Sequence, residues 1–283
     1  MGQWKGNVAV VKKRKKSRSK RKNKRKGLKL NARNIVLIIL AILTVSLFAY
    51  IYYPLYSEWF SKKKAESKDI DSYRKELPNY SVFGIDISHY QKNIEWEKVF
   101  EEQKINFVII RSTMGNEASD NKFQKNWQAL KKTNSIRGAY HYYRPDEDSK
   151  KQAENYIKNV KLEQGDLPPI VDIEKYSSSK SIKALKNEIL KWLEIVEEHY
   201  KITPMIYTYN YFYTKVFLDD MRFEKYPIWI AWYNTNQNPE TIVKDWVFWQ
   251  FSDKCIIKGI DAPVDINVFN GKLRDLDGLR IKN

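Results

Sequence analysis

The clearest indication of the fold is the segment Pro168-Pro169-Ile170-Val171-Asp172-Ile173-Glu174. Two prolines precede a short run of β-branched residues, which is typical of a buried strand with a fixed start. Side chains alternate along a strand, so Asp172 and Glu174 share one face and the apolar residues between them take the other. Two acids on one face repel each other, and burial raises the pKa of at least one. The stretch therefore predicts either an acid pair in a catalytic cleft or a strand end running out into solvent.

The chain around this stretch alternates between strand-like and helix-like segments. Runs rich in β-branched and aromatic residues predict eight strands, at 82–88, 106–113, 136–144, 170–174, 205–210, 228–233, 247–252 and 264–269. Amphipathic spacing predicts helices between the first five of them, at 94–103, 123–132, 149–160 and 182–200. Such alternation implies βαβ units and a parallel sheet. Eight strands with few helices after residue 210 predict an α/β, TIM-like barrel that is incomplete in its last helices.

The positive charge of the chain is concentrated at its start. Its 283 residues carry a formal net charge of +17, but residues 1–33 hold 15 Lys or Arg and no acid. The remaining 36 basic and 34 acidic residues nearly balance. Like charges at this density predict a disordered tail over 1–33. Aromatic residues are not interleaved with the basic runs, so nucleic-acid binding is not expected.

An apolar segment follows the tail. Residues 35–53 are almost wholly apolar, and as a helix they would span roughly 30 Å, the thickness of a bilayer core. We expect a single transmembrane signal anchor over 34–53, with the N-terminus cytoplasmic and the C-terminal part extracellular, because the positive charge precedes it. A cleaved signal peptide is the alternative, but its apolar run is usually shorter. The basic tail then orients the span or contacts anionic lipids.

The remaining domain boundaries follow from composition. Residues 54–80 are charged and read as a stalk or linker between the membrane and the next domain. Residues 81–283 are expected to form the catalytic domain. One cysteine, Cys255, excludes an intrachain disulfide and a cysteine-based metal site, and the three histidines lack ligand spacing. No metal or cofactor is expected.

Four acids fall at strand positions that a barrel would bring together. Asp86 closes the first strand, Asp172 and Glu174 close the fourth, and Asp265 lies in the eighth. Active sites of such barrels lie at the carboxyl ends of the strands, and the first and eighth strands are neighbours. Converging carboxylates indicate glycoside hydrolysis, which uses a pair of them.

Six ordered motifs point to a known family. They are Gly84-Ile85-Asp86-Ile87-Ser88, Phe107-Val108-Ile109-Ile110-Arg111, Gly138-Ala139-Tyr140-His141-Tyr142, Val171-Asp172-Ile173-Glu174, Trp249-Gln250-Phe251-Ser252 and Val264-Asp265-Ile266-Asn267-Val268-Phe269. Residues 82–271 resemble the glycoside hydrolase family 25 lysozymes, the N-acetylmuramidases of bacteria and phages. The resemblance implies a flattened (β/α)5(β)3 barrel and marks Asp86, Asp172, Glu174 and Asp265 as the acidic site.

The residues also suggest a mechanism. Glu174 is the expected general acid, because Asp172 and burial hold its pKa up. Asp172 would orient the 2-acetamido group of the sugar, so that the substrate's own carbonyl oxygen attacks the anomeric carbon with retention. Direct attack by Asp86 or Asp265 is the alternative. Aromatic residues near strand ends are candidates for stacking on sugar faces, or for barrel packing: Tyr140, Tyr142, Tyr207, Trp229, Trp232 and Trp249.

These observations together predict a membrane-anchored muramidase in the cell membrane, facing the cell wall. Its partner would be the glycan strands of peptidoglycan, cut at the β-1,4 bond between N-acetylmuramic acid and N-acetylglucosamine. A catalytically silent wall-binding scaffold and a hydrolase with a glucosaminidase-like or chitinase-like cut are the alternatives.

Overall fold

A computed structural model of the protein describes residues 31–65, 67–133 and 135–282. The chain divides into two compact units, residues 1–58 and 59–283. Residues 1–30, which include most of the predicted basic tail, lie outside the described residues.

A single long helix dominates the described part of the first unit. Helix α1, Ala32–Ala65, starts where the Asn31 side chain accepts a hydrogen bond from the Asn34 N–H at 2.9 Å. Its aliphatic side chains are exposed; Leu43 and Val45 have 59% and 68% of their surface accessible. The predicted transmembrane segment, 34–53, falls within α1. Of the residues that the structure describes, none belong to a helix with both the length and the apolar character needed to cross a membrane.

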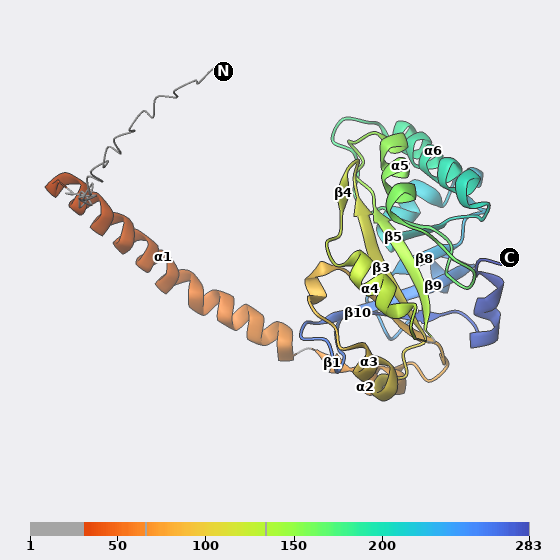
Figure 1. Cartoon of the computed structure of the whole chain (residues 1–283), viewed down its shortest axis with the longest axis horizontal. Helices are drawn as coiled ribbons and strands as arrows, with labels where there is room; N and C mark the ends of the chain where they lie inside the picture. Colours follow the sequence, from red (N-terminus) through yellow and green to blue (C-terminus); the bar gives the residue numbers. More distant parts are fainter. Residues whose placement is uncertain (1–30, 66, 134, 283) are drawn as a thin grey trace, which may run out of the picture. The chain divides into compact units, whose positions relative to one another are not determined.

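One sheet forms the centre of the second unit (Figure 1). Its strands are β1 Lys68–Asp69, β2 Phe83–Ile87, β3 Phe107–Met114, β4 Ala118–Ser119, β5 Ile136–Tyr142, β6 Ile170–Asp172, β7 Met205–Tyr209, β8 Ile228–Ala231, β9 Trp246–Ile256 and β10 Val264–Phe269. The helices are α2 Ile70–Glu76, α3 Trp96–Gln103, α4 Phe123–Leu130, α5 Ser149–Asn159, α6 Ile182–Tyr200 and α7 Asn210–Phe212, with short turns η1 His89–Gln91, η2 Tyr213–Phe217, η3 Met221–Phe223, η4 Pro239–Thr241 and η5 Leu273–Gly278.

The sheet closes into a barrel. Its strands follow the order β9-β10-β2-β3-β5-β6-β7-β8, and β8 pairs back with β9. Each strand is parallel to the next along the series β2-β3-β5-β6-β7-β8-β9. Strand β10 is antiparallel to both of its neighbours, β2 and β9. The prediction of an α/β barrel is therefore confirmed, but the expectation of a wholly parallel sheet is wrong. The link between β9 and β10 is too short for the crossover that parallel neighbours need.

The barrel interior has an apolar floor below a polar mouth. Because side chains alternate along each strand, β3 sends Phe107 and Ile109 inward and Val108 and Ile110 outward. The inward residues pack as a separate buried cluster that includes Val82, Ile170, Met205, Phe248 and Phe269. This cluster excludes water from the lower barrel, so polar inward residues are confined to the carboxyl ends of the parallel strands.

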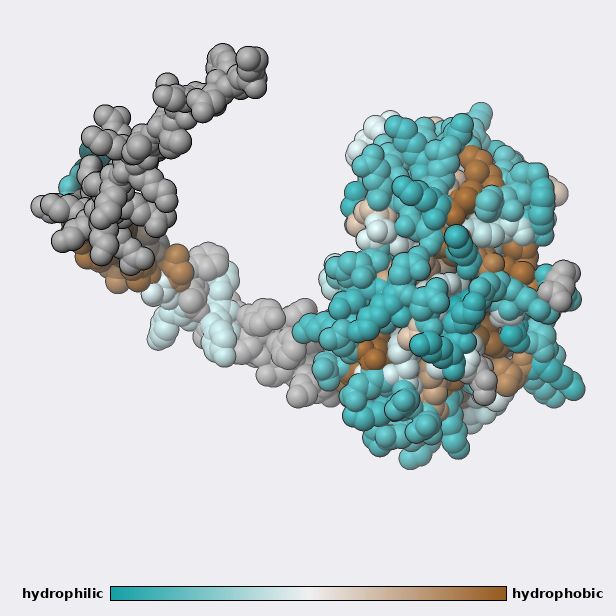
Figure 2. Space-filling model, in the orientation of Figure 1, coloured by the Kyte–Doolittle hydropathy of each residue, from teal (hydrophilic) through white to brown (hydrophobic). Residues whose placement is uncertain are grey.

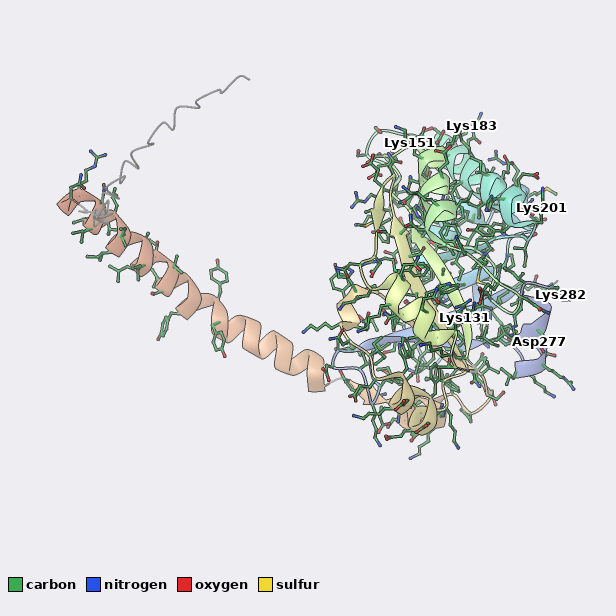
Figure 3. The ribbon with its side chains drawn as sticks, viewed as in Figure 1. Lys131, Lys151, Lys183, Lys201, Asp277 and Lys282 are labelled. Carbon is green, nitrogen blue, oxygen red and sulfur yellow. The ribbon has the colours of Figure 1, made fainter. Side chains whose placement is uncertain are left out.

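The outward face of the sheet is covered by amphipathic helices. Helix α6 begins at Ser181, whose side chain accepts from the Ala184 N–H at 3.2 Å, and it buries Leu185, Ile189 and Leu193 against the sheet. Lysines such as Lys151 and Lys183 project outward from the opposite helix faces (Figure 3). The surface of this unit is accordingly mostly hydrophilic in the view of Figure 2.

The segment before the barrel differs from the predicted stalk. Strand β1 pairs in parallel with the end of β9, and α2 buries Ile70 and Tyr73 in the main core. The Tyr73 hydroxyl and the Ser252 hydroxyl lie 2.6 Å apart in a buried hydrogen bond. The spacer assigned to 54–80 therefore ends earlier, because the apolar residues at 70, 73 and 77 pack on the barrel.

Candidate active site

The barrel mouth gathers the four predicted acids into one pocket. Asp86, Asp172, Glu174 and Asp265 all line a cavity of about 230 Å³. Asp86 and Asp172 are buried, and Glu174 and Asp265 are partly exposed toward the opening. Strands β2, β6 and β10 supply them, so residues almost 180 positions apart in the chain meet at one edge of the sheet.

The reversed direction of β10 places Asp265. A parallel last strand would put its second residue at the floor of the barrel. Because β10 is antiparallel, Asp265 lies directly opposite Asp86 in the register of the two strands. Opposed residues of an antiparallel pair have Cβ atoms about 5 Å apart. The two carboxyl groups therefore belong to the same rim.

Asp86 is held by two side-chain amides. Its Oδ2 accepts hydrogen bonds from Gln250 Nε2 and from Asn267 Nδ2, both at 2.8 Å. Burial raises the pKa of Asp86 to about 6, and the charge of Glu174 adds to this effect. The two amide donors oppose the rise, because a bond to the charged form favours ionisation.

The acids on and after β6 have a different environment. Burial raises the pKa of Asp172 well above its usual range, and the charges of Glu174 and Asp86 add to the rise. The Oδ1 atom of Asp172 is buried and has no hydrogen-bond partner among the described residues. Burial also raises the pKa of Glu174, and this rise is larger than the opposing effect of the nearby Tyr207 hydroxyl. The pocket thus favours protonated carboxyl groups at these two positions.

A second hollow continues from the acid pocket. It has a volume of about 380 Å³ and shares Glu174, Tyr207 and Tyr233 with the first. Its other walls include Tyr209 and Trp232. Glu174 therefore stands between two adjoining spaces, each lined by aromatic rings.

Five of the six predicted aromatic residues line these spaces. Tyr140, Tyr142, Tyr207 and Trp229 border the acid pocket, and Trp232 borders the second hollow. Trp229 is fully buried and donates from Nε1 to Asn267 Oδ1 at 2.8 Å. It therefore has a hydrogen-bonding role that the sequence did not predict.

Trp249 lies apart from the cleft. Alternation along β9 turns Gln250 into the barrel and Trp249 outward, where it is fully buried beside Tyr80 and Trp246. Its Nε1 donates to the Trp232 carbonyl oxygen at 2.7 Å. Of the two roles expected for Trp249, stacking on sugar or barrel packing, the placement favours packing, and the residue is part of the core.

Hydrogen bonds and an ion pair fix the positions of two further residues, His141 and Arg111. His141 is fully buried between Thr113 and Gln152, and burial lowers its pKa to about 4, which keeps it neutral. Arg111 lines the acid pocket, but its ion pair is with Asp120, at 3.2 Å. Its charge still lowers the pKa of Asp172, against the larger effect of burial.

Two polar residues that hydrogen-bond to Asp86 were not predicted as site residues from the sequence. Gln250 accepts hydrogen bonds from the hydroxyls of Tyr207 and Tyr233, at 2.8 and 2.9 Å, while donating to Asp86. Asn267 links Trp229 to Asp86. A signal for both was present, because each is a polar residue with an apolar neighbour on either side in its strand. Asn267 also shares its face with Asp265, two residues earlier.

A larger hollow elsewhere lacks this chemistry. It measures about 650 Å³ and lies where β3 and β5 begin, at the end of the barrel opposite the acids. Arg280, on its wall, is already engaged by the Gly165 carbonyl at 2.7 Å and by Asp277 at 2.7 Å. The acid pocket is therefore the stronger candidate for catalysis.

Comparison with known sequences gives related proteins over the barrel. Residues 85–260 match the family model described as glycosyl hydrolases family 25. An uncharacterized protein, YegX of Escherichia coli O6:H1, is 34% identical over 216 residues, which cover 75% of this chain and 78% of that protein. Lysozyme M1 of Streptomyces globisporus is 30% identical over 201 residues, covering 67% and 68% respectively.

Solved structures agree with the sequence matches. The bacterial lysozyme from Streptomyces coelicolor superposes with a TM-score of 0.65 at 27% identity. The match covers 71% of this chain and 97% of that one. The barrel is thus shared over nearly the whole length of that lysozyme.

Proposed function

This chain belongs to glycosyl hydrolase family 25 and is a glycoside hydrolase, and from this we propose that it cleaves peptidoglycan. The bond cut would be the β-1,4 link between N-acetylmuramic acid and N-acetylglucosamine. The observation that carries the proposal is the position of Glu174, which borders both the acid pocket and the adjoining aromatic hollow. A glycosidic oxygen between sugars in these two spaces would lie beside the carboxyl group.

Glu174 is proposed as the acid and base. A general acid must hold a proton at the working pH and release it to the leaving oxygen. Burial raises the pKa of Glu174, which keeps that proton available. The partial exposure of the residue lets the same carboxylate later deprotonate a water molecule.

Asp172 is proposed to position the substrate. It is buried beside Glu174, and its Oδ1 has no hydrogen-bond partner within the described residues. A protonated Asp172 can donate to, or a charged one accept from, the 2-acetamido group of the sugar in the acid pocket. That contact would turn the acetamido oxygen toward the anomeric carbon, giving retention without an enzyme nucleophile. The alternative is attack by Asp86 or Asp265.

Product analysis tests the bond specificity. Purified wall is incubated with residues 59–283, which form one compact unit, and the reducing ends are identified by mass spectrometry. Reducing N-acetylmuramic acid is the expected result. Reducing N-acetylglucosamine would indicate a glucosaminidase, and wall binding without any product would indicate a scaffold.

We also propose that the protein is held at the cell membrane with its catalytic unit outside. This rests on the basic residues of 1–33 and the apolar run of 35–53. Cell fractionation should place the full-length protein with membranes, and protease added outside should remove the catalytic unit. Recovery in the soluble fraction would contradict the proposal.

A further inference from the structure

The side chain of Asn267 has no role in the proposed mechanism. It lies in the middle of β10, fully buried, and faces the barrel interior like Asp265 two residues before it. Its amide makes two hydrogen bonds of 2.8 Å, one from Trp229 Nε1 to Oδ1 and one from Nδ2 to Asp86 Oδ2. The residue therefore connects an indole ring in the barrel wall to a carboxyl group in the cleft.

The indole fixes the direction of this amide. An amide group can be turned over without changing its shape, so its oxygen and nitrogen must be assigned from their partners. The indole N–H of Trp229 is only a donor, and the amide oxygen is the only acceptor it can meet on Asn267. The NH₂ group is thereby directed at Asp86, and the Asp86 oxygen must accept.

A second amide acts on the same oxygen. Gln250 Nε2 donates to Asp86 Oδ2 at 2.8 Å, and Gln250 Oε1 accepts from two tyrosine hydroxyls. An oxygen that accepts two N–H bonds cannot itself carry the proton. If Asp86 were protonated on its other oxygen, Oδ2 would be a weaker acceptor for both N–H groups, so these bonds stabilise the carboxylate.

The charged surroundings make this support necessary. Asp86 has almost no exposed surface, and its neighbours in the cleft are mainly acidic or phenolic. The titratable groups that line the cleft with it are Asp172 and Glu174 from the β6 edge, Asp265 from β10, Arg111 from β3, Tyr90 from η1, Tyr140 and Tyr142 from β5, Tyr207 from β7 and Tyr233 after β8. Arg111 is the cation among them, and it is engaged by Asp120.

From this geometry we propose that Asn267, oriented by Trp229, is a positioning residue that keeps Asp86 ionised and fixed in the cleft. Among the residues that the structure describes, none donates to the buried Oδ1 of Asp172, so the proton shared among the acids resides away from Asp86. The carboxylate then presents a negative charge to the positive centre that develops on the sugar. This deepens the proposed function and rests on it for its catalytic meaning.

The test compares three variants of the full-length protein. Asn267→Leu removes the donor to Asp86 and keeps a similar volume. Trp229→Phe removes only the group that orients the amide. Trp249→Phe is the matched control, because it deletes an equivalent indole hydrogen bond on the outward face of the barrel. Thermal unfolding checks that each variant folds.

Two readouts follow the charge on Asp86. One is the pH dependence of kcat/KM for wall hydrolysis. The other is the ¹³C NMR titration of the Asp86 carboxyl group, assigned by its loss in Asp86→Asn. We expect Asn267→Leu to move both the acid limb and the titration upward by about one pH unit or more. Trp229→Phe should move them in the same direction by less, and Trp249→Phe should leave both where they are.

The outcomes separate this inference from the proposed function. Titration midpoints that stay at the wild-type value in Asn267→Leu and Trp229→Phe would overturn the role of Asn267, as would an equal shift in Trp249→Phe. Loss of activity at every pH with an unmoved limb would indicate a merely structural role. A wild-type protein that cuts no glycan, yet shows the expected titration shifts, would contradict the function and leave the ionisation of Asp86 explained.

Discussion

At the scale of single residues, the cleft depends on which carboxyl groups carry protons. Asp86 accepts two amide bonds, whereas the buried Oδ1 of Asp172 accepts none from the described residues. Glu174 lies between two adjoining spaces of about 230 and 380 Å³, and burial raises its pKa. These differences assign separate tasks to acids that look equivalent in the sequence.

Glu174→Gln tests the general acid directly. The amide keeps the shape of the side chain but has no proton to transfer, so kcat/KM should fall by about 10²–10⁴-fold. Thermal unfolding should show no loss of stability, because the change removes a carboxyl group that burial disfavours. Glu154→Gln, an exposed change on α5, is the control and should keep wild-type activity. Near-wild-type hydrolysis by Glu174→Gln would refute the assignment.

The raised pKa values also predict how stability depends on pH. A carboxyl group whose pKa is raised in the folded state binds its proton more tightly there than in the unfolded chain. Its stabilising contribution is complete below the unfolded pKa and is lost as pH rises through the folded value, which is about 6 for Asp86. Asp86→Asn should therefore flatten the decline in unfolding free energy between about pH 4 and pH 6, measured by urea denaturation. An unchanged slope would contradict the shift.

The acids that line the candidate site were predicted from the sequence, but the residues that hydrogen-bond to them were not. Asp86, Asp172, Glu174 and Asp265 were predictable as neighbours because a barrel brings the first, fourth and eighth strands to one mouth. Gln250 and Asn267 were missed because their role depends on cross-barrel distances that no local pattern encodes. Trp249 was left open between sugar stacking and barrel packing, because the alternation of side chains between it and Gln250 was not applied.

At the scale of elements, a short turn after β2 carries strain beside the cleft. The turn η1 is closed by a capping box between Ser88 and Gln91, and the next residue, Lys92, has φ 58° and ψ −120°. A non-glycine residue in this region costs about 1–3 kcal/mol. The strain is maintained by the contacts that hold η1 at the mouth.

Lys92→Gly should relieve that strain. Glycine adopts positive φ without a Cβ clash but loses more entropy on folding, so we expect a net stabilisation of about 1 kcal/mol. Lys201→Gly, at the αL C-cap of α6, is the comparison and should gain less, because αL is the milder conformation. Urea denaturation measures both. A destabilised Lys92→Gly protein would show that the Lys92 side chain stabilises the fold by more than its backbone strain destabilises it.

The predicted helices and strands agree with the structure where the hydrophobic periodicity is strong, whereas the direction of a strand was not predicted. Helix α6 has the predicted bounds, and the strands agree within a few residues. The reversal of β10 was not predicted, because hydrophobic alternation is the same for either strand direction. Helix α2 was missed although Ile70, Tyr73 and Leu77 form a helical stripe, since the charged residues around them dominated the pattern.

At the scale of the whole molecule, the barrel extends further toward the N-terminus than the family match. That match begins at residue 85, whereas β1 and α2 bury Ile70, Tyr73 and Leu77 in the core. Segment 67–80 is therefore part of the barrel unit, and a spacer has to end before it.

Truncation tests this boundary. A protein starting at residue 67 should unfold cooperatively with the stability of residues 59–283. One starting at residue 81 should lose about 5 kcal/mol or more, from three large buried side chains. Tyr73→Phe, which removes only the hydroxyl bonded to Ser252, should cost about 1 kcal/mol. Equal urea midpoints for the two truncations would show that the segment only rests on the surface.

The closed ring of strands has a consequence for crowded surroundings. An open sheet edge offers unpaired backbone groups that can template a strand from another molecule. Here β8 pairs with β9, and the strands added outside the ring, β1 and β4, are two residues each. Many copies can therefore gather at high local concentration without exchanging strands through open sheet edges.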